Sequence, residues 1–90
     1  MCVNDITAQR IMSVLEKRGL RIPEDIAISG FDNMEPIIPS HNILTTVDFS
    51  AEKLGMMAAN CLLMRIKYPD SPYSVSYVES HVIYRKTTGD

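Results

Sequence analysis

The stretch GLRIPEDIAISGFDN, residues 19–33, places a helix end, a turn, a short apolar run and a polar turn one after another. Gly19 followed by Leu20 is typical of a helix C-terminus. The turn RIPED comes next, and the run IAISGF, residues 26–31, is typical of a strand that is covered on both faces. This stretch therefore predicts a helix that ends, turns and leads into a buried strand.

The residues before this stretch predict the helix itself, over residues 6–18. Its apolar positions repeat at the spacing of one helix face: Ala8, Ile11, Met12 and Leu15. Asp5 is predicted to be the N-cap, and residues 1–3 are predicted to form a strand before it. A strand, a helix and a second strand in this order predict a right-handed βαβ unit with parallel strands, and hence an α/β fold.

The residues after this stretch predict three further elements. Two prolines make residues 34–42 a loop or a broken helix, and the β-branched run ILTTV, residues 43–47, predicts a strand. Ser50 is predicted to cap a second helix that ends at about Lys67. The tail, residues 75–88, is rich in Val, Ile, Tyr and Thr and predicts one bent strand or two short ones.

The second helix is apolar nearly all round. A narrow polar stripe interrupts it, formed by Glu52, Lys53, Asn60 and Lys67. A helix of this kind needs cover on more than one side, and a chain of 90 residues has only a thin core of its own. We therefore expect the chain to leave this helix incompletely covered.

Composition argues against several functions for these residues. The net charge is −2, the pI is about 5.6 and no run of Lys or Arg occurs, so the charge pattern of a nucleic-acid-binding domain is missing. The longest apolar stretch, residues 54–64, is too short to cross a bilayer. Cys2 and Cys61 form no CxxC pair, which favours two buried thiols in a reducing cytosol. We expect a soluble, cytoplasmic protein.

Four polar residues follow the two predicted parallel strands, at the edge where ligands bind in open α/β sheets: Asn4, Asp5, Asp32 and Asn33. Their amide and carboxylate groups can make several hydrogen bonds at once, which suits a polyhydroxylated ligand such as a sugar. The alternative is structural, with Asp5 as a helix cap and the other three as turn residues. The pattern favours the cap for Asp5 and leaves both roles open for Asn4 and Asp32.

No catalytic or metal-binding motif is recognisable. The sequence contains no GxSxG, GxGxxG or GxxxxGK[ST] segment, so it lacks the parts of a hydrolase, a dinucleotide-binding site or a P-loop. His41 and His81 have no cysteine or histidine at ligand spacing. Asp5 and Asp32 could form a carboxylate pair for acid–base chemistry, as in a small α/β enzyme, but no nucleophile accompanies them. We expect no enzyme, no metal site and no cofactor.

Five segments follow one another in a distinctive order and spacing: Val3-Asn4-Asp5, residues 19–33, LTTV at 44–47, Leu54-Gly55 and YRKTTG at 84–89. Together they closely resemble the C-terminal end of the lactose-repressor/galactose-repressor (LacI/GalR) family. This resemblance implies a bacterial transcription regulator in which a helix-turn-helix domain precedes an effector-binding core of the periplasmic-binding-protein-like (type I) fold. The chain resembles the last third of that core, so we expect the DNA-binding domain and the first core subdomain to lie outside it.

The resemblance also implies how the chain is divided. All 90 residues would form one partial effector-binding domain. Residues 1–42 and about 80–90 would belong to the C-terminal subdomain, residues 43–49 would be a crossover, and residues 50–79 would pack mainly with the N-terminal subdomain. The fold would then be a parallel βαβ unit, a crossover strand, a second helix and C-terminal strands.

By the same resemblance, three residues would contact the effector. Asn4 and Asp32 would hydrogen-bond the hydroxyls of a sugar or a similar small polar molecule, with Asp5 as a structural cap beside them. Many relatives have Gln-Pro at the position of Phe49-Ser50. Phe49 would therefore stack on a sugar face instead of hydrogen-bonding to it.

The partners that the resemblance implies are an effector, a second copy of the chain and operator DNA. The helix from Ile6 and the loop at residues 34–40 resemble the family's dimer-forming surface, and a two-fold protein suits two half-sites on DNA. Operator DNA would be reached only through the missing N-terminal domain. The alternative is a fragment of a periplasmic sugar-binding protein of an ABC transporter, which a signal peptide upstream would distinguish.

Overall fold

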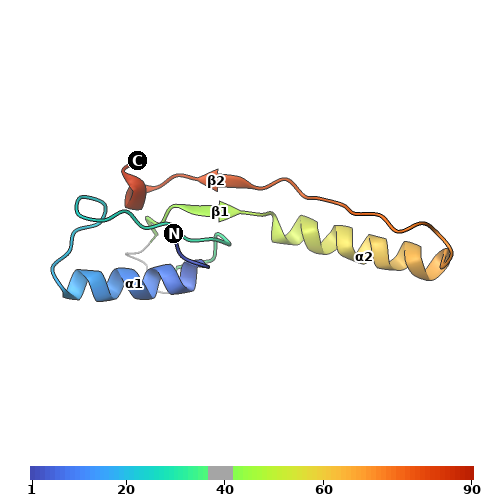
Figure 1. The fold of residues 1–90 in the computed structure, drawn as a ribbon, viewed down its shortest axis with the longest axis horizontal. Coiled ribbons are helices and arrows are strands. Elements are labelled where there is room, and N and C mark those ends of the chain that lie inside the picture. Colours follow the sequence, from blue (N-terminus) through green and yellow to red (C-terminus); the bar gives the residue numbers. More distant parts are fainter. Residues whose placement is uncertain (37–41) are drawn as a thin grey trace. The chain divides into compact units, whose positions relative to one another are not determined.

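The computed structural model describes residues 1–36 and 42–90. Its regular elements, in chain order, are α1 (Asp5–Lys17), β1 (Thr46–Asp48), α2 (Ala51–Lys67), β2 (His81–Ile83) and the 3-10 helix η2 (Lys86–Thr88) (Figure 1). The chain divides into two compact units. Unit 1 contains Met1–Asp48 and His81–Asp90, and unit 2 contains Phe49–Ser80. The chain therefore leaves unit 1 after Asp48 and returns to it at His81.

Helix α1 begins one residue earlier than the sequence predicts. Asn4 is its N-cap, because the backbone of Asn4 is extended and its Oδ1 accepts a hydrogen bond of 2.9 Å from the amide of Thr7. The prediction that Asp5 is the cap is therefore wrong. Asp5 is the first helical residue, and its carboxylate binds partners outside the helix instead. At the other end Gly19 has a left-handed φ of 78°, which confirms the predicted helix stop.

Three extended segments of unit 1 run side by side and parallel: residues 1–4, 28–31 and 45–47. The first and second are joined by the amide of Cys2, which donates to Ser29 O at 2.7 Å. The second and third are joined by the amide of Gly30, which donates to Thr45 O at 2.9 Å. This parallel arrangement is the one that the sequence predicts for a βαβ unit.

Regular strands do not form at residues 1–3 and 26–31, so these two predictions are wrong in detail. The second and third extended segments share an isolated parallel bridge between Ser29 and Thr45, which lies outside the named strands. Residues 26–27 are exposed, and residues 28–31 of the apolar run are buried or half-buried. The described residues do not supply the two-sided cover that a longer parallel strand needs.

Strands β1 and β2 pair antiparallel, with Thr46 opposite Ile83 and Asp48 opposite His81. β1 is shorter than the predicted strand at residues 43–47 and ends one residue later. In the tail, the predicted strand structure is limited to β2, and η2 follows it. The ladder ends at the pair of Thr46 and Ile83. Just before β1, the amide of Thr45 donates 2.9 Å to the hydroxyl of the buried Thr87.

The core of unit 1 is small. Its buried apolar side chains come from α1, from the second extended segment and from the residue that precedes the third: Ala8, Met12, Ile28 and Leu44. Partly covered side chains pack around them: Cys2, Leu15, Ile22 and Ile43. Cys2 is therefore half-buried, whereas Cys61 on α2 is exposed, so the prediction of a buried thiol is wrong for Cys61.

Unit 2 consists of α2 and the segment that follows it (Figure 1). α2 ends at Lys67, as predicted. Ser50 occupies the predicted N-cap position, with a left-handed φ of 56°, but its side chain makes no capping hydrogen bond. None of the residues of α2 is buried, and Leu63 and Ile66 are 63% and 69% exposed. The described residues thus leave this apolar helix uncovered, as its sequence predicts.

The predicted loop at residues 34–42 lies partly outside the described residues, and so does His41. Its described beginning and end contain no helix or strand. Within residues 1–36 and 42–90, neither α-helix is long and apolar enough to span a membrane.

Candidate functional site

A buried carboxylate lies at the centre of unit 1. The Asp5 side chain is 1% exposed, and its Oδ1 accepts a hydrogen bond of 2.7 Å from the hydroxyl of Thr46. Its Oδ2 accepts a hydrogen bond of 2.8 Å from the amide of Met34, and its own backbone amide donates to Phe31 O at 3.0 Å. One residue therefore joins the start of α1, the polar turn after the second extended segment and β1.

Gly30 allows this close approach. A Cβ added there would collide with Asp5 Oδ1 and would lie 3.1 Å from Leu44 Cδ2. Gly30 has no Cβ, so its backbone can pass directly against the buried carboxylate. The glycine of the GFDN motif is thus required by packing beside the site.

The polar turn itself has an unusual backbone. Asp32 has a φ of 107° and Asn33 a φ of 53°, backbone conformations that residues other than glycine seldom adopt. Two hydrogen bonds hold the turn against β1: the Asp32 amide donates to Val47 O at 2.9 Å, and the Asn33 amide donates to Thr46 Oγ1 at 3.1 Å. Both residues are half-buried. The surrounding structure therefore fixes the position of Asp32.

The side chain of Asn33 bridges the ends of two strands. Its Nδ2 donates 3.4 Å to Asp48 Oδ2 in β1, and its Oδ1 accepts 3.1 Å from Arg85 Nη2, just after β2. Arg85 also donates through Nη1 to Leu44 O at 3.0 Å. The Asn33 side-chain amide thus donates to an acidic group and accepts from a basic group.

The predicted site residues are distributed over both units. Asn4 and Asp32 lie in neighbouring turns of unit 1. Asp5 connects these turns, because its backbone amide donates to Phe31 O and its carboxylate accepts from the Met34 amide. Phe49 is half-buried and is the first residue of unit 2. Its place beside Asn4 and Asp32 remains a prediction.

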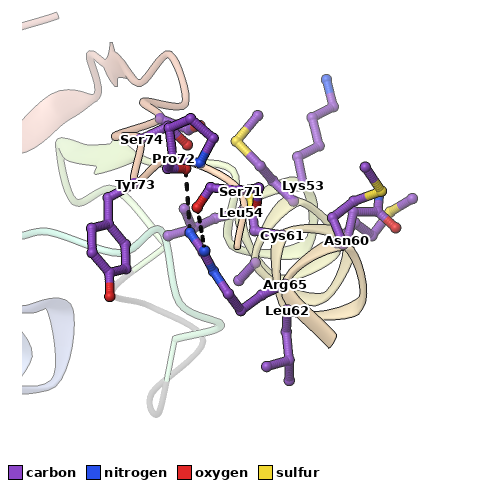
Figure 2. A pocket seen from close by; sticks show the side chains of 15 residues that line it. Lys53, Leu54, Asn60, Cys61, Leu62, Arg65, Ser71, Pro72, Tyr73 and Ser74 are labelled. Carbon is purple, nitrogen blue, oxygen red and sulfur yellow. Dashed lines mark hydrogen bonds between the residues drawn. The ribbon is translucent and has the colours of Figure 1, made fainter. Parts of the chain in front are cut away.

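A large hollow in the described part of the chain has none of these residues in its lining. It is a groove of about 950 Å³ in unit 2, between α2 and residues 71–76 (Figure 2). Arg65 closes one side of it by donating to Ser71 O at 2.6 Å and by lying 4.8 Å from the ring centre of Tyr73. The groove is lined mainly by the exposed apolar side chains of α2, which suits a packing surface better than a site for a polar ligand.

Another hollow, of about 230 Å³, lies in unit 1. Its lining includes Gly30, Thr46 and Tyr84. Its lining also omits Asn4 and Asp32.

An ion pair outside the site shapes the turn after α1. The Arg21 guanidinium donates to Asp25 through Nε at 3.3 Å and Nη2 at 3.2 Å, and the Arg21 amide donates to the same carboxylate at 2.8 Å. The side-chain bond, and then the backbone bond, lower the pKa of Asp25 below its usual value. This pair is exposed and closes a surface turn.

Sequence reasoning missed three residues of this network: Thr46, Asp48 and Arg85. Thr46 belongs to a β-branched run that predicts only a strand, and Arg85 belongs to the YRKTTG segment, which predicts no role for it. Asn33 was recognised as a polar residue at the sheet edge, but its two partners lie 15 and 52 residues away in the chain. No local pattern reports contacts at such separations.

Comparisons with known proteins agree with this architecture. Residues 1–88 match the family of periplasmic binding protein-like domains. The chain is 38% identical over 86 residues to the HTH-type transcriptional repressor PurR of Vibrio atlanticus (strain LGP32), a match that covers 96% of this chain and 26% of that protein. It is 35% identical over 89 residues to PurR of Aliivibrio fischeri (strain ATCC 700601 / ES114), covering 99% and 26%. The chain thus spans about a quarter of the length of these relatives.

Solved structures give the same result. A LacI-family protein from Sanguibacter keddieii DSM 10542 has a TM-score of 0.80 at 26% identity, and the match covers 98% of this chain and 33% of the other. A periplasmic binding protein/LacI transcriptional regulator from Alkaliphilus metalliredigens QYMF, in complex with D-xylulofuranose, has a TM-score of 0.77 at 33% identity, with the same coverage. The predicted α/β, periplasmic-binding-protein-like fold and the resemblance to LacI-type regulators are confirmed.

Proposed function

This chain belongs to the family of periplasmic-binding-protein-like domains, and we propose that it is the C-terminal part of the effector-binding core of a LacI-type transcriptional regulator. The observation that carries this proposal is the match over residues 1–88, in a chain whose two polar turns meet at one edge of parallel segments. Ligands of open α/β folds bind at such an edge. The role is binding and signalling, without turnover of a substrate.

The effector is a sugar or a similar small polar molecule. Asn4 uses Oδ1 to cap α1, so we assign its effector contact to the Nδ2 donor. Asp32 supplies carboxylate oxygens that accept hydrogen bonds from hydroxyls, on a turn that β1 holds in place. Phe49 supplies an apolar ring face for stacking. The D-xylulofuranose bound by the relative from Alkaliphilus metalliredigens supports a sugar as the first class to test.

The signal travels through the segments that connect the two units. Unit 1, with Asp32, corresponds to the C-terminal subdomain, and unit 2 packs mainly with an N-terminal subdomain supplied by the rest of the protein. The exposed apolar surface of α2 supports this, because it needs such cover. Effector binding between subdomains favours a closed arrangement, and the coupling to a distant operator site is typically about 1–3 kcal/mol.

The regulator acts in the cytoplasm as a homodimer. Its dimer surface includes α1, where Ile11 and Val14 are exposed apolar residues. DNA contact is made by a helix-turn-helix domain outside this chain, in agreement with the net charge of −2 here. The relatives named as HTH-type transcriptional repressors support this assignment.

A second candidate is a periplasmic sugar-binding protein of an ABC transporter. The name of the Alkaliphilus metalliredigens relative includes both classes, and the two share one core fold. The upstream coding sequence distinguishes them, since a transport protein requires a signal peptide and a regulator requires a helix-turn-helix domain.

The test uses the complete protein encoded with this chain. Genomic footprinting identifies its operator, and calorimetry with pentoses and hexoses, and with nucleobases as non-sugar polar ligands, identifies the effector. We expect the effector to change operator affinity and Asp32→Ala to abolish effector binding while leaving effector-free operator binding intact. Asp25→Ala is the matched control, since it removes a surface acid of the same unit. Absence of any operator, or equal effects of the two substitutions, would argue against the proposal.

A further inference from the structure

We propose that Asn33 is a positioning residue that couples the turn carrying Asp32 to the two strands through which the chain leaves and re-enters unit 1. The inference rests on the proposed function, in which Asp32 contacts the effector. It adds a physical connection between that contact and the crossover segments, which would move when the subdomains close.

The geometry places Asn33 at the exit point. Asp48, which receives the Asn33 Nδ2 bond of 3.4 Å, is the last residue before unit 2 begins. Arg85, which donates 3.1 Å to Asn33 Oδ1, follows β2, the strand that returns from unit 2. A single side chain is therefore hydrogen-bonded to both connections. Asp32 is its immediate neighbour in the chain.

The chemistry at this position favours an amide. Arg85 is a donor and Asp48 is an acceptor, and an amide offers one partner for each on the same planar group. A carboxylate would keep the Arg85 bond but would repel Asp48. Asparagine also tolerates the left-handed backbone at this position, which has a φ of 53°. Asparagine therefore suits both the left-handed backbone of the turn and the hydrogen bonds to its two partners.

The backbone makes the coupling stiff. Asp32 and Asn33 both have positive φ, so the turn occupies a restricted region from which small adjustments are costly. The backbone amide of Asn33 donates to Thr46 Oγ1, and the Thr46 hydroxyl in turn donates to the buried Asp5 carboxylate. A shift of Asp48 or Arg85 that pulls on the Asn33 side chain is thus passed to Asp32 instead of being absorbed by a flexible loop.

Coupling is measured with a double-mutant design on 15N-labelled protein, without any effector. Asp48→Asn changes the charge at the exit point, and the readout is the backbone amide resonance of Asp32. We expect Asp48→Asn to shift that resonance in the wild type and to lose this effect in Asn33→Gly. Asn33→Gly removes the bridge but keeps the left-handed backbone accessible, so a purely structural role of the turn is preserved.

Two further variants test the two ends of the bridge. Asn33→Asp should keep the bond to Arg85 and replace the bond to Asp48 by repulsion, whereas Arg85→Met should remove the bond at the other end. Val82→Ala, on the exposed face of β2, is the control and should leave Asp32 unaffected in every background. An Asp48→Asn effect of equal size with and without the Asn33 side chain would overturn the proposal, because the direct bond from Asp32 to Val47 would then carry the coupling. No effect in the wild type would overturn it as well.

These outcomes are independent of the regulator assignment. The coupling is measured without effector or operator, so it can hold in a protein that binds neither. A regulator with a confirmed effector and operator, but without coupling through Asn33, would refute this inference and leave the proposed function standing.

Discussion

The hydroxyl of Thr46 donates a hydrogen bond of 2.7 Å to Asp5 Oδ1, although 41 residues separate the two along the chain. Both side chains are almost completely buried. The bond ties the first turn of α1 to β1, and a second bond from the Met34 amide to Oδ2 adds the polar turn. Asp5 is therefore the residue on which the position of both candidate binding turns depends.

Asp5→Asn should destabilise the protein by about 2–4 kcal/mol, because an amide nitrogen would face a donor and a charge-assisted bond in a buried site would be lost. The midpoint of urea unfolding measures this. Asp25→Asn is the control, since that carboxylate is exposed and paired at the surface. Equal losses for the two variants would show that the buried bonds contribute little.

Gly30→Ala and Gly55→Ala should have opposite effects. A Cβ at Gly30 would collide with the Asp5 carboxylate, so we expect a loss of roughly 1–3 kcal/mol. A Cβ at Gly55, inside α2, has no atom within 4 Å. Since glycine disfavours the helix, that substitution should stabilise α2 by about 0.5–1 kcal/mol. Unfolding midpoints and helical circular dichroism check both, and a neutral Gly30→Ala would contradict the close approach.

Asn4 should have two separable roles. Asn4→Ala removes the cap of α1 and should cost about 1 kcal/mol, whereas Asn4→Ser keeps an acceptor for the Thr7 amide and should retain most of the stability. Both substitutions remove the amide donor and should weaken effector binding by the complete protein. Denaturant unfolding and calorimetry separate the two quantities. Normal effector binding by Asn4→Ser would leave Asn4 with the structural role alone.

The helices were predictable because their signals are local. The apolar spacing gave α1, and Gly19 marked its end with a left-handed φ of 78°. The choice between Asn4 and Asp5 as cap was not decided by local sequence, since both side chains can accept a hydrogen bond at that position. Tertiary contacts determine which residue is the cap. The Asp5 carboxylate accepts hydrogen bonds from Thr46 and Met34, and Asn4 makes the capping bond.

The strands and the polar network were less predictable because they depend on distant partners. Of the run at residues 26–31, which the pattern predicts to be covered on both faces, residues 26–27 are exposed, since that cover is not within the described chain. The Asn33 bridge joins residues 15 and 52 positions away. Composition could indicate that residues such as Asp48 and Arg85 are available, but not that both contact Asn33.

Arg21→Ala should raise the pKa of Asp25 back toward 3.8, the value of an unpaired aspartate, because the Arg21 side-chain bond is the main cause of its lowering. A carboxyl group with a folded-state pKa below its unfolded-state pKa stabilises the fold above the unfolded-state value, and the contribution disappears as the pH falls through the folded-state pKa. The Arg21 variant should therefore lose the part of the acid sensitivity that lies below pH 3.8. NMR titration of the Asp25 carboxyl carbon measures it, and an unchanged midpoint in the variant would contradict the pairing.

The 90-residue chain by itself should bind pentoses and hexoses weakly or not at all. In the proposed function Asn4 and Asp32 supply one side of the cleft, and the remaining contacts come from a subdomain outside the chain. A small number of polar contacts on an open surface cannot exclude water from a ligand, so the chain alone should have little affinity for a sugar. Calorimetry with D-xylulose and other sugars, run in parallel on the chain and on the complete protein, measures the difference. Micromolar binding by the chain alone, unaffected by Asp32→Ala, would place the binding site elsewhere in these residues.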